Sequence, residues 1–180
     1  MTREGVAAGT TRAIVAEAGM PLSLFHYCFG SRDELVGALI RRLGAAERAA
    51  VWAGITPGAD LVAVLRSAAD AYLHHLTASP GQEQVLFELN HYALRTPGME
   101  HLAAEQMAMY LESARVVLDR IAELTGVSWT IPVDELARLV VTIADGVTTT
   151  WLADRDTAAS RTALGRLLEL VASYAGPTAV

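Results

Sequence analysis

The sequence contains no lysine and only one cysteine. All 14 basic residues are arginines, a bias that we attribute to GC-rich codon usage. With Cys28 alone, no disulfide bond can form within the chain, which favours a reducing compartment. No apolar run follows Met1, so we expect no signal peptide. The most apolar late stretch, residues 136–152, is interrupted by Arg138 and Asp145 and is not expected to span a membrane. We therefore expect a cytoplasmic protein.

Sequence motifs for nucleotide binding and catalysis are also absent. There is no P-loop, no glycine-rich dinucleotide fingerprint and no Ser-His-Asp set, so we expect no cofactor and no enzymatic activity. Glu88 and His91 have the spacing of helical metal ligands, but no second set matches them. We interpret the two as a hydrogen-bonded pair or as polar lining of a pocket, and expect no metal. An α-helical enzyme that uses them as its titratable groups is an alternative.

The composition predicts a packed globular protein with an uneven charge. Hydrophobic residues make up 52% of the 180 residues, too many for a disordered chain. The net charge is -6, but the first 48 residues hold six arginines and five acidic residues, whereas the remainder holds eight and fifteen. This distribution favours a small nucleic-acid-binding head on an acidic body with another role.

The hydrophobic pattern predicts an all-α protein of about eight helices. Apolar residues recur at spacings of three and four, breaks fall at proline and glycine, and nothing indicates a strand. Residues 126–132 are expected to form a loop. The expected helices are two short ones joined at 18–20, followed by helices near 31–52, 58–78, 80–95, 97–125, 133–153 and 157–175.

Residues 10–35 have the pattern of a helix-turn-helix. Phe25 and Phe29 share one face of the second short helix and should point into the core, which leaves the opposite face for the major groove of DNA. Ser31 and Glu34 form a capping box that starts the next helix. A plain helical hairpin has the same spacing and is the alternative. The candidate DNA contacts are Thr11, Arg12, Leu22, Ser23, His26, Tyr27, Ser31 and Arg32.

This segment resembles the DNA-binding head of the TetR (TetR/AcrR) family of bacterial transcriptional regulators. Pro21, Ser23, His26 and Cys28 depart from the family pattern, and Leu22 stands where a polar groove contact is often found, so base specificity does not transfer. The residues that match the pattern outright are Thr10, Arg12, Ile14, Ala18, Gly19, Phe29, Ser31 and Leu35.

The resemblance also predicts a difference at the N-terminus. In that family a helix of about a dozen residues precedes the segment, whereas residues 1–9 contain two glycines and can form about one turn at most. We therefore expect the first helix of the DNA-binding domain to be missing. The division that follows is a truncated helix-turn-helix head at 1–47 and a helical ligand-binding and dimerisation body at 48–180.

For the body, the resemblance implies a ligand cavity and a two-fold dimer interface. Mid-helix Gly146 predicts a close helix crossing, because glycine is otherwise unfavourable in a helix. The candidate ligand-binding residues are Phe87, His91, Met99, Leu102, Gln106, Met109, Tyr110, Ser113 and Trp151. The candidate interface residues are Val141, Thr148 and Thr149 on one of the last two helices, and Ala163, Arg166 and Leu170 on the other.

The function implied by the resemblance is that of a homodimeric, ligand-responsive regulator. It would be a repressor that binds a double-stranded DNA operator and is released by a small apolar molecule. The alternative is a small-molecule-binding helical dimer that has lost DNA binding.

Overall fold

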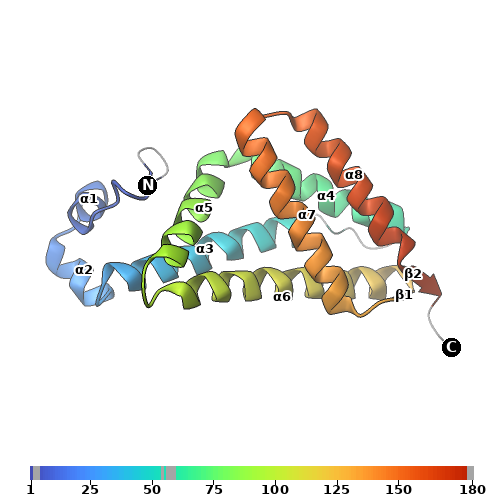
Figure 1. Ribbon diagram of the computed structural model, residues 1–180, viewed down its shortest axis with the longest axis horizontal. Helices are drawn as coiled ribbons and strands as arrows, with labels where there is room; N and C mark the ends of the chain where they lie inside the picture. Colours follow the sequence, from blue (N-terminus) through green and yellow to red (C-terminus); the bar gives the residue numbers. More distant parts are fainter. Residues whose placement is uncertain (2–4, 54, 56–59, 178–180) are drawn as a thin grey trace. The chain divides into compact units, whose positions relative to one another are not determined.

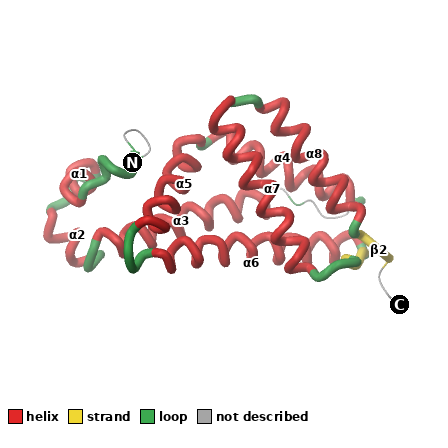
Figure 2. Tube along the Cα trace, viewed as in Figure 1, coloured by secondary structure: helices red, strands yellow, loops and turns green. Residues whose placement is uncertain are grey.

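The computed structural model describes residues 1, 5–53, 55 and 60–177. Within these residues the predicted all-α fold and the number of helices are confirmed (Figures 1 and 2). The expected start of the fourth helix, near residue 58, lies outside the described residues. The elements are α1 (Thr11–Glu17), α2 (Leu22–Cys28), α3 (Arg32–Ala53), α4 (Leu61–Ala78), α5 (Pro80–Arg95), α6 (Glu100–Thr125), β1 (Val127–Trp129), α7 (Val133–Asp154), α8 (Thr157–Ser173) and β2 (Ala175–Pro177).

The chain forms two compact units. Unit 1 comprises Met1–Ala45 and Pro80–Met107, and unit 2 comprises Ala46–Ser79 and Ala108–Val180. Unit 1 thus combines the helix-turn-helix with α5 and the start of α6. The sequence analysis had assigned α5 and α6 to the ligand-binding and dimerisation body at 48–180. The functional division into a head at 1–47 and this body remains a prediction.

In unit 1, local hydrogen bonds set the ends of the first helices. The Thr10 hydroxyl caps α1 by accepting a backbone N–H at 3.2 Å. The turn to α2 passes through Gly19, whose φ of +64° is unfavourable for a residue with a Cβ. At the start of α3 the Ser31 hydroxyl accepts the Glu34 N–H at 3.1 Å, while the Glu34 carboxylate accepts the Gly30 N–H at 2.8 Å. The predicted capping box therefore forms, with its return bond one residue earlier than usual.

Unit 2 is built around the apolar faces of its helices. In this unit α8 packs against both α4 and α7 (Figure 1). Although α7 is long and apolar enough by composition to cross a membrane, its Leu136 and Trp151 belong to this core and are 0% and 5% exposed. Leu76, Ile121 and Val171 bring α4, α6 and α8 into the same cluster, each at 2% exposure or less. We therefore interpret α7 as the core helix of a globular unit.

One polar contact fixes α4 against α7 inside unit 2. The Tyr72 hydroxyl donates to the backbone carbonyl of Ala144 at 3.0 Å and is also hydrogen-bonded to the hydroxyl of Thr148. Thr148 is only 3% exposed, so its hydroxyl needs such a partner.

The expectation that the chain has no strands is wrong at one place. β1 and β2 form a two-stranded antiparallel ladder in which Ser128 pairs with Gly176. Residues 127–129 were expected to be loop and residue 175 to end a helix. Three-residue strands carry too few residues for a period-two pattern to show in the sequence.

Candidate DNA interface and ligand-binding residues

The exposed face of α2 carries the four side chains predicted to enter the major groove. Leu22, Ser23, His26 and Tyr27 are all exposed, and Tyr27 is 87% exposed. Leu22 and His26 are four residues apart, as are Ser23 and Tyr27, so the four side chains lie on one side of the helix. The face offers an apolar side chain that can touch a thymine methyl and three groups that can hydrogen-bond to base edges.

Aromatic packing holds this face outward. Phe25, on the opposite side of α2, is 4% exposed, and its ring lies 5.6 Å from that of Phe29. Val15 of α1 is buried as well, at 9% exposure. The predicted core face of the helix-turn-helix is therefore present.

The remaining predicted DNA contacts differ in their availability. Arg12 is exposed in the first turn of α1, beside the half-buried Thr11. The exposed Ser31 uses its hydroxyl to cap α3. Arg12 is thus the cation of the helix-turn-helix best placed to reach a phosphate.

Arg32, by contrast, is held inside unit 1. Its Nε donates to the carbonyl of Gly9 and its Nη2 to the carbonyl of Val6, each at 3.2 Å. Its guanidinium carbon lies 4.8 Å from the centre of the Tyr92 ring on α5. The planar guanidinium suits this arrangement, because its donors diverge in one plane while its face stacks on the ring. The expected phosphate contact therefore competes with three internal contacts.

Glu88 of α5 completes this arrangement. Its carboxylate accepts the Val6 N–H at 2.6 Å, and Val6 is 4% exposed. We call Val6, Gly9, Arg32, Glu88 and Tyr92 the N-terminal clamp. It fixes the turn at residues 5–9, where the sequence predicts at most one helical turn. Sequence reasoning missed the clamp, because Val6 and Glu88 are 82 residues apart and the spacing of Glu88 pointed to His91 instead.

Five of the predicted ligand-binding residues lie in unit 1. Met99, Leu102 and Gln106 are buried, and the Gln106 amide oxygen accepts a hydrogen bond from Asn90 at 3.0 Å. His91 is exposed, and its Nδ1 lies 2.8 Å from the carbonyl of the half-buried Phe87. None of these hydrogen bonds shows that the five residues bind a ligand, and that role remains a prediction.

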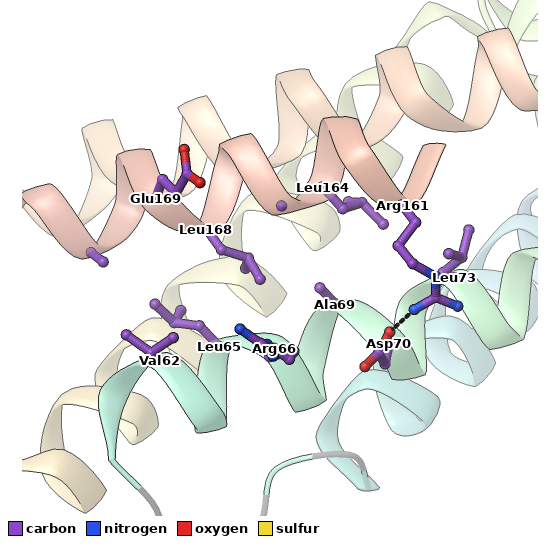
Figure 3. A pocket seen from close by; sticks show the side chains of 12 residues that line it. Val62, Leu65, Arg66, Ala69, Asp70, Leu73, Arg161, Leu164, Leu168 and Glu169 are labelled. Carbon is purple, nitrogen blue, oxygen red and sulfur yellow. Dashed lines mark hydrogen bonds and ion pairs between the residues drawn. The ribbon is translucent and has the colours of Figure 1, made fainter. Parts of the chain in front are cut away.

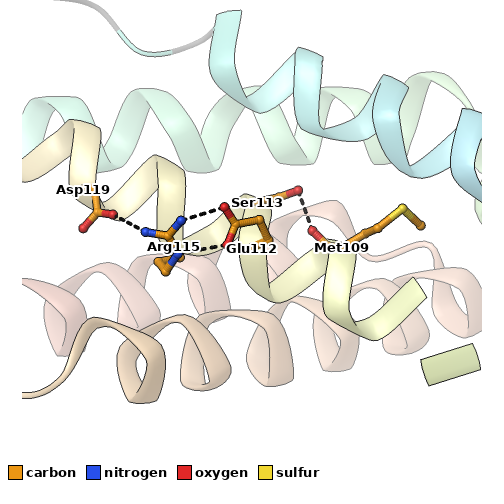
Figure 4. Close-up of polar contacts among 5 residues, drawn as sticks. All are labelled: Met109, Glu112, Ser113, Arg115 and Asp119. Atoms are coloured by element: carbon orange, nitrogen blue, oxygen red, sulfur yellow. Dashed lines mark hydrogen bonds and ion pairs between the residues drawn. The ribbon is translucent and has the colours of Figure 1, made fainter. Parts of the chain in front are cut away.

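The other four lie in unit 2. Met109, Tyr110 and Ser113 are half-buried on α6, and the Ser113 hydroxyl donates to the Met109 carbonyl at 2.7 Å (Figure 4). The Trp151 indole donates to the Thr157 hydroxyl at 3.0 Å, and the Arg155 guanidinium lies 4.5 Å from its ring centre. Trp151 is therefore engaged at the corner between α7 and α8.

The exposed side of α6 carries an ion-pair network. Arg115 donates to Glu112 at 2.6 Å and to Asp119 at 2.9 Å (Figure 4). The hydrogen bonds from Arg115 lower the pKa of the Glu112 carboxyl. The guanidinium of Arg115 is thus engaged by two carboxylates on the surface of the helix.

The predicted dimer interface needs a correction. Val141 and Thr148 are 7% and 3% exposed within the subunit, so their side chains are not available to a partner. Thr148 instead contacts Tyr72. Thr149, Ala163, Arg166 and Leu170 are exposed, as the interface hypothesis requires. The prediction failed for two residues because periodicity does not tell which apolar side of a helix faces the subunit's own core.

The predicted close crossing at Gly146 is not made by any helix that the structure describes. A Cβ added at Gly146 would meet no described atom within 4 Å.

Two half-buried titratable groups of unit 2 have shifted pKa values. Next to Gly146, burial raises the pKa of the Asp145 carboxyl above its usual value. On α4, burial, with a smaller contribution from His74, lowers the pKa of His75.

No metal site is found among the described side chains. In the described part of the chain, no three His, Cys, Asp or Glu residues are grouped so that they could hold an ion. Glu88 belongs to the clamp, whereas the His91 ring contacts the backbone of its own helix.

Comparisons with known proteins agree with the helix-turn-helix geometry. Residues 1–39 match the family of bacterial regulatory proteins, tetR family. The HTH-type nicotine-responsive transcriptional repressor HdnoR of Paenarthrobacter nicotinovorans is 24% identical over 152 residues, which cover 84% of this chain and 77% of the relative.

Solved structures share the fold over nearly the whole chain. A transcriptional regulator from Rhodococcus sp. Rha1 superposes with a TM-score of 0.76 at 17% identity, covering 97% of this chain and 90% of the other. The multidrug binding protein EbrR, complexed with imidazole, gives 0.64 at 26% identity, covering 92% and 87%. Residues 1–39 thus match the tetR family of bacterial regulatory proteins, and the chain as a whole is similar to a transcriptional repressor in sequence and to solved regulators in fold.

Proposed function

We propose that the protein is a homodimeric repressor that binds an operator through α2 and leaves it when a small apolar molecule binds. The observation that carries the DNA-binding part is the exposed face of Leu22, Ser23, His26 and Tyr27, supported from behind by buried Phe25. No acidic residue lies in α2 to repel the phosphates. The exposed Arg12 supplies a phosphate contact beside it.

A two-fold dimer accounts for the exposed faces of α7 and α8. On α7, Gly146 and Thr149 leave room for a second helix to approach closely, and on α8 Ala163 and the 36% exposed Leu170 lie on the surface. Small residues allow two helix backbones to come near each other, which explains a glycine in mid-helix. In such a dimer the two recognition helices would lie about 34 to 36 Å apart.

The ligand-responsive part is supported by the relatives. HdnoR is described as nicotine-responsive, and EbrR as a multidrug binding protein. The dimer would have two arrangements, one in which the two recognition helices match the spacing of the operator and one in which they do not. A ligand that binds the second arrangement more tightly would lower the affinity for the operator, at most by the ratio of its affinities for the two arrangements. We expect the ligand to be small and apolar, and to contact the half-buried residues of α6.

A DNase I footprint on DNA upstream of the protein's own gene tests this proposal. We expect two protected half-sites whose centres lie about one helical turn apart. A Leu170→Glu variant, which places a charge in the proposed interface, should lose both the dimer and the footprint. The ligand-binding dimer without DNA binding would give a dimer in sedimentation but no footprint.

A further inference from the structure

Unit 2 contains a groove that the proposed function does not use. It lies between α4 and α8, has a volume of about 600 Å³, and is open to solvent (Figure 3). Its floor is apolar, because Leu65, Leu73 and Leu164 line it and are 2–4% exposed. The volume is within the range of sites that hold small organic molecules.

Small side chains keep the groove open. Ala69 of α4 and Gly165 of α8 both line it, and a Cβ added at Gly165 would meet nothing within 4 Å. No side chain of the described residues therefore fills the space beside Gly165. The groove runs along α4 from Val62 to Leu73, a length of about 16 Å at the helical rise of 1.5 Å per residue.

Among the described residues at the rim of the groove, the cation of Arg66 has no acidic partner. Asp70 forms an ion pair across the groove with Arg161. Glu169 pairs with Arg166 on its own helix at 2.6 Å, and its carboxylate points away from α4 in Figure 3. Arg66 also lines the groove and is exposed, and among the described residues it forms no ion pair. Both acidic groups are thus neutralised, and the guanidinium of Arg66 remains available.

We propose that this groove binds an amphipathic anion, namely a carboxylic acid with an unbranched apolar tail of about nine carbons, which fits the roughly 10 Å of groove between Arg66 and Leu73. The tail lies on the leucine floor beside Gly165, and the carboxylate pairs with Arg66. Apolar contact with the floor supplies the affinity and the guanidinium supplies the selection for a negative headgroup. The site lies within unit 2 and does not depend on whether the protein binds DNA.

Calorimetric titration of the full-length protein, without DNA, tests the proposal. Decanoate is the probe, and decyltrimethylammonium, which has the same tail and the opposite charge, is the comparison. We expect decanoate to bind at least tenfold more tightly than the cation. Each methylene removed in the series decanoate, octanoate, hexanoate should weaken binding roughly fourfold per carbon.

Two pairs of variants locate the binding. Gly165→Leu fills the groove and should weaken decanoate at least tenfold, whereas Gly165→Ala leaves the space open and should not. Arg66→Glu should reverse the preference towards decyltrimethylammonium, whereas Arg120→Ala, which removes an arginine of unit 2 outside the groove, should leave it unchanged. Since Arg66 is exposed, its variant tests the proposal even if Gly165→Leu does not fold.

Three results would overturn the proposal. They are no binding of decanoate to the native protein, equal binding of the two headgroups, or unchanged decanoate affinity in Arg66→Glu. Circular dichroism of each variant confirms that the helices are retained. A change in the oligomeric state on adding decanoate, measured by sedimentation, would also contradict the proposal, because it would indicate that the groove is a contact between copies of the chain.

Discussion

Arg32→Ala separates two roles for the arginine that begins α3. The sequence predicts that Arg32 contacts a DNA phosphate, whereas in the structure Arg32 belongs to the N-terminal clamp. The substitution removes two hydrogen bonds from a charged donor, which contribute about 1.5 kcal/mol each at the low end of their range. It also removes the contact with the Tyr92 ring, which adds about 0.5 kcal/mol at a partly exposed site.

The expected loss of roughly 3.5 kcal/mol should appear in the thermal unfolding of unit 1. For a chain of this size the midpoint should fall by about 7–14 °C. All three tryptophans, Trp52, Trp129 and Trp151, lie in unit 2. Helix content by circular dichroism follows both units, whereas tryptophan fluorescence follows unit 2 alone. We expect the dichroism midpoint to fall by more than the fluorescence midpoint.

The salt dependence of DNA binding tests the other role of Arg32, the contact with a phosphate. A lost phosphate contact lowers the slope of log affinity against log salt by about one. If Arg32 acts through the clamp, Arg32→Ala leaves that slope unchanged. Arg32→Lys keeps the charge but not the planar fork, so it should retain little of the lost stability. A variant with native stability and a reduced slope, restored by lysine, would refute the clamp.

Three further predictions follow from single contacts. Arg12→Ala should show the opposite pattern to Arg32→Ala, with unchanged thermal stability and a salt slope reduced by about one in fluorescence anisotropy; an unchanged slope would contradict its role. Tyr72→Phe should cost about 1–2 kcal/mol in urea unfolding followed by tryptophan fluorescence, because it removes the hydroxyl that joins α4 to α7; exposed Tyr27→Phe is the control without effect. Asp145→Asn should stabilise the protein at pH 7, because the folded state raises the carboxyl pKa and so disfavours its charge. The gain should be full above the raised pKa and vanish below the usual value near 3.8; equal unfolding free energies at pH 7 would show that burial does not act on this carboxyl.

The sequence predicted the helix-turn-helix well because its signals are local. Thr10, Gly19 and Ser31 act on backbone groups within four residues of themselves, so their roles can be recognised without knowing the fold. Phe25 was correctly placed in the core by its spacing from Phe29.

Contacts between distant segments could not be predicted in the same way. The clamp joins Val6 to Glu88, and the groove joins α4 to α8, and neither pairing leaves a periodic trace in the sequence. Thr148 was assigned to a partner-facing surface because a helix apolar on two sides gives no indication of which side is internal. Which residues of α6 contact a ligand depends on such long-range packing, and those assignments remain predictions.

Affinity of the full-length protein for DNA flanking its gene, compared with a scrambled sequence at physiological salt, tests the central claim most directly. Specific binding by regulators of this kind is at least about a thousandfold tighter than non-specific binding. We expect such a ratio for the native protein and a much smaller ratio for His26→Ala with Tyr27→Ala, at unchanged thermal stability. Equal affinity for both DNA sequences would contradict the account and favour a ligand-binding dimer without a DNA-binding role.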